Sequence, residues 1–418
     1  MRLLPQNGAV SNALGAPASC RLAAQQRRAA TVCALLLLGL AGCQTPSRPL
    51  SNVEIQDGFS IAPASPLQAE LQKDRSADGS FARTPEMNAR TSRPRFDAAQ
   101  TPAGAVVQIA ARVPITEGEG AWPTNWTSGW IPLESWGRMN GLGKPVQVPS
   151  NPHPKFELQT GQGSIAVKIG SRIAQCNGLE CWLGYAPQLI SGQPYINAVD
   201  ARQNLQPVVE LADHRVLLSG TIVIDPGHGG ADGGTRNVFN RRFEKEYTLD
   251  WALRLRSLLV ARGWKVTLTR TSDAEVSLAE RIAIAERARA DLFLSLHFNS
   301  GEPNRELSGI ETYCLTPSGM PSHLLRDYDD NVRQIFPNNA FDDENFMLAF
   351  RLHRSVIQYS GASDRGVRRA RFMAVLRPQN RPAVLIEAGY LSNARDAQHI
   401  DSPAYRQLLA EAVAKGLE

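Results

Sequence analysis

The feature that most constrains this chain is a set of short apolar runs, each followed by a residue that can bind a metal or move a proton. The runs are rich in Ile, Val and Leu and cover residues 221–224, 292–296 and 383–386. Runs of this length and composition, bounded by Gly or Pro, are typical of buried strands. His228 lies a few residues after the first run, and His297 and Glu387 directly follow the second and the third. Since strand ends line the ligand crevice of an open α/β sheet, these side chains are candidates for one site.

From about residue 216 onward, strand-like and helix-like patterns alternate. Helices are expected over residues 244–262, 277–290 and 403–417. Further strands are expected over residues 265–269, 310–315 and 372–376. This alternation predicts an α/β fold for residues 216–418, in which helices flank a twisted, mostly parallel or mixed sheet.

The His residues and nearby carboxylates predict a metal site. Glu244 opens the first helical pattern, with Glu246 as an alternative position. Two His and one carboxylate, with a further Glu nearby, are the residue set of a catalytic zinc site that keeps one position open. Asp225 could either orient a ligand imidazole or cap the turn after its strand. The alternative for the two His is a hydrogen bond to backbone, and for Glu387 a structural pairing with an Arg.

The N-terminus has the composition of an export signal. Arg27 and Arg28 precede an apolar run over residues 34–41 that leads into Gly42 and Cys43. A basic flank, a short apolar core and small residues at its end predict a signal peptide over residues 1–43. The Leu-Ala-Gly-Cys ending resembles a bacterial lipobox, in which Cys43 would carry a lipid anchor to the membrane. We expect an exported lipoprotein facing the periplasm, with a soluble periplasmic or secreted protein as the alternative.

The next two regions differ in composition. Residues 44–102 are rich in Pro, Ser, Ala, Gln and charge, which predicts a flexible linker. Residues 104–210 carry short alternating runs broken by Gly, Pro and Asn, as expected for a small β-rich domain. Binding to cell wall is a candidate role for this domain. Several Trp gather there and form either a glycan-stacking surface or aromatic core: Trp122, Trp126, Trp130, Trp136 and Trp182.

Cysteine and histidine placement adds weaker expectations. Cys176 and Cys181 enclose an Asn-Gly turn, so they either form a hairpin disulfide or remain two thiols on adjacent strands. His323, His353 and His399 lie outside any motif and are expected at the surface. The net charge of +5 does not indicate nucleic-acid binding, since no basic motif with interleaved aromatics is present.

Several separate motifs in the C-terminal half resemble the zinc-dependent N-acetylmuramoyl-L-alanine amidase family. They occur in the family's order at residues 222–230, 244–245, 291–297, 365–367 and 384–393. Two positions depart from the family's usual pattern. Phe298 stands where a small residue is usual, so its larger side chain could reshape the pocket wall. Glu286 stands where Asn is frequent.

This resemblance implies roles for particular residues. His228, Glu244 and His297 would bind Zn²⁺, and Glu387 would be the catalytic glutamate. The substrate would be peptidoglycan, cut at the amide between N-acetylmuramic acid and L-alanine. Zn²⁺ activates water and polarises a carbonyl, while Glu387 would take a proton from water and give it to the departing nitrogen.

Two further resemblances concern the flanking segments. Residues 104–210 loosely resemble the β-rich module named after the copper amine oxidase N-terminal domain, although no His or Cys set there supports a copper site. Some amidases of the family carry an insertion near residues 319–345 that blocks the zinc until an activator protein removes it. Glu344 is a candidate for such a cap, and an exposed irregular loop is the alternative.

Two other functions stay open at this point. A zinc peptidase could act on a different amide with the same residues. An inactive wall-binding lipoprotein could retain the fold without the chemistry, although all four chemical positions are present.

Overall fold

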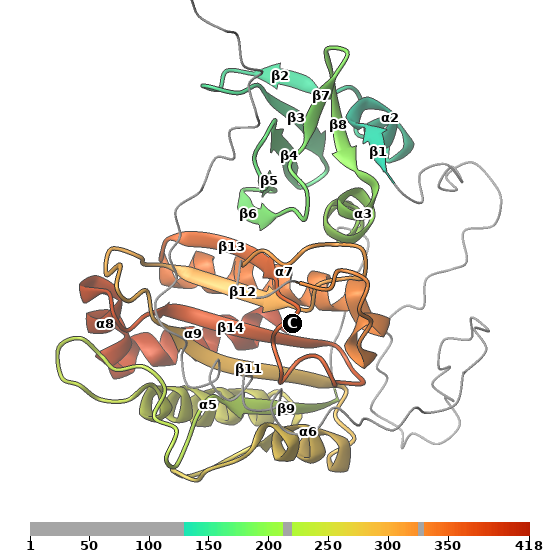
Figure 1. The fold of residues 1–418 in the computed structure, drawn as a ribbon. Coiled ribbons are helices and arrows are strands. Elements are labelled where there is room, and N and C mark those ends of the chain that lie inside the picture. Colours follow the sequence, from blue (N-terminus) through green and yellow to red (C-terminus); the bar gives the residue numbers. More distant parts are fainter. Residues whose placement is uncertain (1–128, 212–219, 325–329) are drawn as a thin grey trace, which may run out of the picture. The chain divides into compact units, whose positions relative to one another are not determined.

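The computed structural model describes residues 129–211, 220–324 and 330–418 (Figure 1). The expected signal segment, the linker and the first part of the β-rich region lie outside the described residues. Within the described ranges, every helix is too short or too polar to cross a bilayer.

The central part of the sheet consists of parallel strands. β10 (Lys265–Leu268), β9 (Thr221–Pro226), β11 (Leu292–Asn299) and β14 (Ala383–Tyr390) follow one another in that order. β12 (Ile310–Cys314) runs antiparallel to β14, and β13 (Asp364–Arg369) runs parallel to β12. The sheet is therefore mixed and lies between helices, which confirms the predicted fold class.

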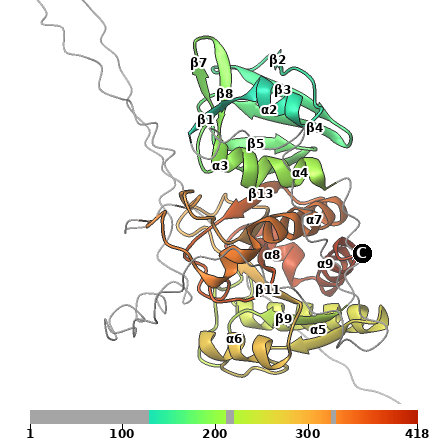
Figure 2. The same cartoon turned by 90° about the vertical axis from the view of Figure 1, so that its right-hand side faces the viewer.

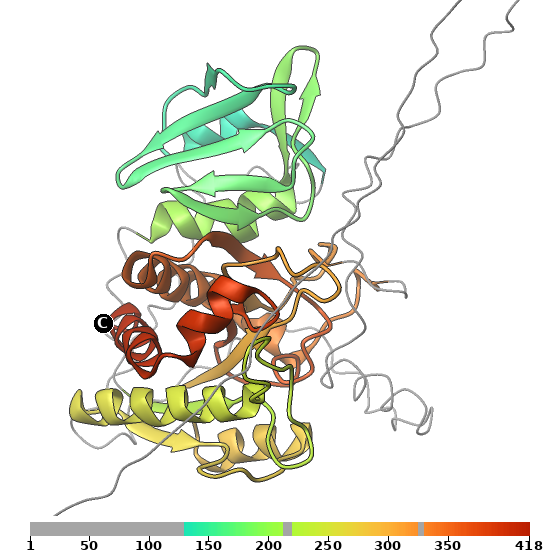
Figure 3. The same cartoon turned by 90° about the vertical axis from the view of Figure 1, so that its left-hand side faces the viewer.

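Both faces of these strands are covered, and this is why the apolar runs are nearly continuous. One face packs against α5 (Glu244–Ala261), α7 (Asp342–Ser360) and α9 (Pro403–Gly416), and the opposite face packs against α6 (Leu278–Arg287). Figures 2 and 3 show the two groups of helices on opposite sides of the strands. Residues at alternate positions belong to different cores, so Ile222 and Ile224 face α5 while Val223 faces α6.

Local signals fix where the helices begin and end. The Ser277 hydroxyl caps α6 by accepting from the Glu280 backbone N–H. Glu246 closes the first turn of α5, where its carboxylate accepts from the Phe243 N–H at 3.0 Å. Helix α7 ends at Gly361, whose φ of +62° is the left-handed conformation that glycine tolerates.

One expected strand is wrong. Residues 372–376 form buried turns, and the strand in this part of the chain is β13, a few residues earlier. The apolar side chains of Phe372, Met373 and Val375 cover the α6 face of the sheet. Their hydrophobicity therefore reflects burial of a covering loop, which a short apolar run does not distinguish from a strand. Helix α8 (Ala394–Asp401), capped by the Asn393 side chain, was not expected.

The described residues of the β-rich region form mostly strands. A meander of antiparallel neighbours runs through β2 (Val146–Val148), β3 (Lys155–Thr160), β4 (Gly163–Lys168), β5 (Ile173–Cys176) and β6 (Leu179–Trp182). A small separate sheet contains β1 (Trp130–Pro132), β8 (Gln193–Asn197) and β7 (Gln188–Ile190). α2 (Leu133–Met139) follows β1, and α3 (Ala198–Asp200), a π-helical turn (Ala201–Leu205) and α4 (Gln206–Glu210) follow β8. β6 pairs with β13, where Cys181 lies opposite Val367, so the two regions share one continuous sheet.

Several expectations for single residues are resolved here. Trp136 is core and Trp130 and Trp182 are half-buried, while Trp122 and Trp126 lie outside the described residues. Cys176 and Cys181 are buried free thiols on neighbouring strands.

The expected exposure of two histidines is wrong. His353 is buried between Thr312 and Asp364, with bonds of 3.0 and 2.8 Å to its two ring nitrogens. His323 is also buried, and its Nδ1 accepts from the Arg369 N–H at 2.7 Å. Such polar partners let a histidine lie in a core, and they are not visible in the sequence.

Candidate metal centre

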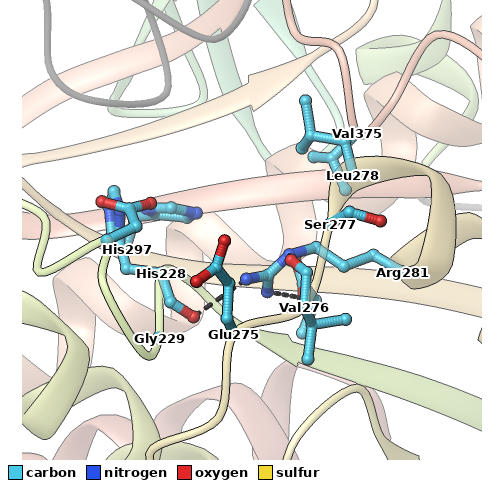
Figure 4. A pocket seen from close by; sticks show the side chains of 11 residues that line it. His228, Gly229, Glu275, Val276, Ser277, Leu278, Arg281, His297 and Val375 are labelled. Atoms are coloured by element: carbon cyan, nitrogen blue, oxygen red, sulfur yellow. Dashed lines mark hydrogen bonds and ion pairs between the residues drawn. The ribbon is translucent and has the colours of Figure 1, made fainter.

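Three side chains from distant parts of the chain meet at the carboxyl ends of β9 and β11. His228 lies in the loop after β9, His297 lies on β11, and Glu244 is the first residue of α5. Their candidate ligand atoms all lie within 4.8 Å of one another. Glu244 bridges the imidazoles, with Oε2 at 3.0 Å from His228 Nε2 and Oε1 at 3.0 Å from His297 Nδ1. All three side chains are buried, and Figure 4 shows the two imidazoles together at one end of the cavity.

Two glycines make this convergence sterically possible. A Cβ on Gly227 would lie 2.2 Å from the His297 ring. A Cβ on Gly234 would lie 2.5 Å from Glu244 Oε2, and this glycine also has φ +65°. The Gly-rich sequence around His228 is therefore required for backbone and ligand side chains to approach each other closely.

Asp232 orients the first imidazole. Its Oδ2 accepts from His228 Nδ1 at 2.7 Å, which leaves Nε2 directed at Glu244. Its other oxygen accepts from the Gly234 N–H at 3.0 Å. A carboxylate on the outer nitrogen of a histidine is the usual support of a metal-ligating imidazole. The only hint of this role in the sequence is the position of Asp232 four residues after His228.

Asp225 does neither of the things expected of it. Its carboxylate is buried and ion-paired with Arg281 of α6, and it accepts from Thr269 Oγ1 at 2.6 Å and Ser295 Oγ at 2.8 Å. Arg281 also donates to the carbonyl of His228. Asp225 and Arg281 therefore tie the end of β9 to α6 beneath the site. Asp225 does not orient an imidazole because Thr269, which follows β10, Ser295 of β11 and Arg281 of α6 bind its carboxylate.

The charges of the cluster suit a cation. Burial alone would lower the pKa of His228, but Glu244 and Asp232 raise it to about 10. Burial raises the pKa of Glu244, yet the two imidazoles outweigh it and hold that pKa well below its usual range. An anionic carboxylate between two imidazoles thus attracts positive charge, which a proton or a metal ion can supply. Two imidazoles and one carboxylate, supported by Asp232, fit a zinc ion.

Glu387 lies next to this cluster without being bound by it. On β14 it is opposite His297 of β11 and also opposite Glu311 of β12. The side chain is half-buried overall, but its Oε2 is enclosed and has no hydrogen-bond partner among the residues that the structure describes. Burial raises the pKa of Glu387 well above its usual range, and the charges of Glu244 and Glu311 raise it further. The arginines nearby, Arg365 and Arg368, pair with Glu311.

The two imidazoles of the cluster line a small cavity, whereas Glu244 and Glu387 are not among its lining residues. Its far wall comes from the segment before α6, and Figure 4 shows the Glu275 carboxylate on that wall, facing the imidazoles. The lining consists of Asp225, His228, Gly229, Asp232, Glu275, Val276, Ser277, Leu278, Arg281, His297 and Val375. A site open to one side leaves room for a substrate group beside the ligands.

Two expectations about the pocket are not supported. Phe298 points to the opposite face of the sheet and packs on Trp251 of α5, with ring centroids 5.5 Å apart, so it does not form the pocket wall. Glu344 lies in the first turn of α7 and is not among the lining residues. Of residues 319–345, the part that the structure describes contributes nothing to the cavity lining.

Comparison with known proteins gives consistent matches over the second half of the chain. Residues 222–418 match the family described as N-acetylmuramoyl-L-alanine amidase. The crystal structure of an N-acetylmuramoyl-L-alanine amidase from Clostridium difficile 630 is 31% identical, over 47% of this chain and 94% of that one, with a TM-score of 0.40.

Curated relatives are similar over the same region. The amidase LytC of Bacillus subtilis (strain 168) is 32% identical over 54% of this chain and 39% of its own length. The amidase CwlM of Bacillus licheniformis is 35% identical over 47% of this chain and 66% of its own length. The chain thus spans less than two thirds of the length of these relatives.

Proposed function

Residues 222–418 belong to the N-acetylmuramoyl-L-alanine amidase family, and we propose that the chain hydrolyses the amide between N-acetylmuramic acid and L-alanine in peptidoglycan. The observation that carries this proposal is the meeting of His228, Glu244 and His297 beside a glutamate with an unpartnered oxygen. Amide hydrolysis needs an electrophilic activator and a group that moves protons, and this arrangement offers a place for each.

In the proposed mechanism, His228, Glu244 and His297 would hold Zn²⁺, which would supply a Lewis acid when bound. Asp232 keeps the His228 ring in the orientation that directs Nε2 inward. Glu387 accepts a proton from the attacking water and donates it to the leaving nitrogen, a contribution of about 10²–10⁴-fold in rate. Its enclosed Oε2 is free for this purpose because the neighbouring arginines are occupied by Glu311.

Digestion of purified sacculi tests this function. Mass spectrometry should find free lactyl ends and intact stem peptides, whereas a zinc peptidase would leave cuts within the stem. Glu387→Gln should lose most of the activity. Glu246→Gln is the matched control, since Gln preserves the exposed cap of α5 and Glu246 is the alternative to Glu244. Full lytic activity of Glu387→Gln would contradict the proposal, and binding of sacculi without any cleavage would favour the inactive wall-binding alternative.

We further propose that the protein is exported and anchored through a lipid on Cys43. In this arrangement residues 44–102 form the tether, residues 104–210 the β-rich domain and residues 216–418 the catalytic domain. The support is the signal-like composition of residues 1–43. Metabolic labelling with a fatty acid should mark the wild type and not Cys43→Ser. Labelling of both would contradict the anchor, and release of an unlabelled wild type would favour plain secretion.

Control by an activator protein stays a prediction. Since none of the described residues of 319–345 lines the cavity, we expect measurable activity from the purified chain without a partner. A purified, zinc-loaded protein that becomes active only on addition of cell extract would indicate such a partner.

A further inference from the structure

A row of acidic and basic side chains crosses three strands beside the site. Glu387 on β14 is the register partner of His297 on β11 and of Glu311 on β12. Side chains that are directly opposite across neighbouring strands lie on the same face, with Cβ atoms about 4.5–5.5 Å apart in antiparallel pairs. Glu311 is therefore the immediate neighbour of Glu387 on the side away from the ligand cluster.

Glu311 is held in place by an unusually complete set of donors. Its side chain is buried and accepts from Tyr313 OH at 2.7 Å, Tyr390 OH at 2.9 Å and Asn299 Nδ2 at 3.1 Å. Arg365 Nε lies 2.8 Å away and Arg368 Nη2 lies 3.3 Å away. A buried carboxylate with two arginines and three further donors stays ionised and fixed.

The two arginines are in turn held by the β-rich region. Trp182, the last residue of β6, donates from its indole N–H to the Arg365 carbonyl at 3.2 Å. The Arg368 guanidinium lies over the Trp182 ring, 4.1 Å from its centroid. Gly366 permits this approach, since a Cβ there would lie 2.9 Å from the indole ring. A cation–π contact with a tryptophan face is attractive, so it favours this one position of the long Arg368 side chain.

We infer that Trp182 is a positioning residue for the active site, which it supports by holding Arg365 and Arg368 on Glu311 and away from Glu387. This inference rests on the proposed function of Glu387. If Arg368 were released from the indole, it could pair with the enclosed Oε2 of Glu387 instead of Glu311. A guanidinium bound to Oε2 would occupy the oxygen that is now unpartnered, so Glu387 would no longer be free to contact the attacking water.

A consequence concerns the β-rich region as a whole. Its β6 edge pairs with β13 through Cys181 and Val367, and the Glu180 N–H donates to Asp364 at 2.8 Å. The β-rich region therefore supports the two arginines from one side, in addition to any role in binding cell wall.

The test compares Trp182→Ala, Trp182→Phe and Tyr185→Phe in the full chain, by steady-state kinetics on a soluble muropeptide. Tyr185→Phe is the matched control, since it removes a 2.8 Å bond to the Gly319 carbonyl from the same interface without touching the arginines. We expect Trp182→Ala to lower kcat about tenfold with little change in KM, in line with a partial loss of proton transfer. Trp182→Phe keeps an aromatic face and should recover most of kcat, and Tyr185→Phe should match the wild type.

Glu311→Gln removes the charge of the carboxylate that Arg365 and Arg368 bind, so the inference stays testable if Trp182→Ala does not fold. We expect it to lower kcat at unchanged KM and zinc content. The inference is overturned if folded Trp182→Ala, or folded Glu311→Gln, keeps the wild-type kcat, or if Tyr185→Phe loses as much kcat as Trp182→Ala. A wild type that is inactive on every muropeptide would instead refute the proposed function.

Discussion

Removing Asp232 should weaken metal binding without abolishing it. The perturbation is Asp232→Ala, which deletes the acceptor 2.7 Å from His228 Nδ1 and frees the ring to rotate. Loss of such a support typically costs about 10–100-fold in metal affinity. The Asp232 side chain is 29% exposed, so water can replace part of the bond, and we expect the lower end of this range. Asp232→Asn should lie between Asp232→Ala and the wild type, because its amide oxygen still accepts.

The assay is a competition titration of zinc against a chromophoric chelator. Asp273→Asn is the matched control: it removes the same charge from the same side of the molecule, but Asp273 contacts Lys245 and the Gly230 N–H instead of an imidazole. We expect wild-type affinity from this control. If both variants weaken zinc binding equally, then overall charge matters and orientation of His228 does not, and the role assigned to Asp232 is wrong.

Three further predictions follow from the same geometry. Since Glu244 and Asp232 raise the pKa of His228 to about 10, zinc binding at pH 7 should release about one proton, seen as a dependence of the calorimetric enthalpy on the buffer; equal enthalpies in all buffers would contradict it. Gly227→Ala should abolish zinc binding, because its Cβ would lie 2.2 Å from the His297 ring, whereas Gly161→Ala, with open space around it, should bind normally. Burial and the neighbouring arginines hold the pKa of His323 well below its usual value, so the stability it contributes is present above about pH 6.5 and is lost as the pH falls below that. His323→Asn retains an acceptor but does not titrate, so its melting temperature should decline less than that of the wild type between pH 7 and pH 5. A melting temperature that falls with pH as steeply as in the wild type would refute this.

The parts of the fold that the sequence predicts are those where one local signal suffices. Continuous apolar runs identify β9, β11 and β14, because strands covered on both faces have no polar alternation. A capping residue or an acidic first turn places the starts of α5 and α6 to within a residue. Residues 372–376 fail because a covering loop buries as much apolar surface as a strand.

The residues of the site also fall into those that the sequence predicts and those that it does not. Two histidines and the carboxylates after strand ends could be predicted, since parallel strands deliver their carboxyl ends to one edge. The choice of Asp232 over Asp225 could not, because it depends on Arg281, Thr269 and Ser295 binding Asp225 first. The contact of Trp182 with Arg368 was equally invisible, since it joins residues 186 positions apart only after β6 and β13 pair.

The most direct test is an anomalous difference map, collected at the zinc absorption edge from crystals of the purified full chain. We predict a single strong peak in coordination contact with His228, Glu244 and His297, with the Glu387 carboxylate beside it and not bonded to it. A map without a peak among these three side chains, in protein that is active on peptidoglycan, would contradict the metal centre on which the proposed chemistry depends.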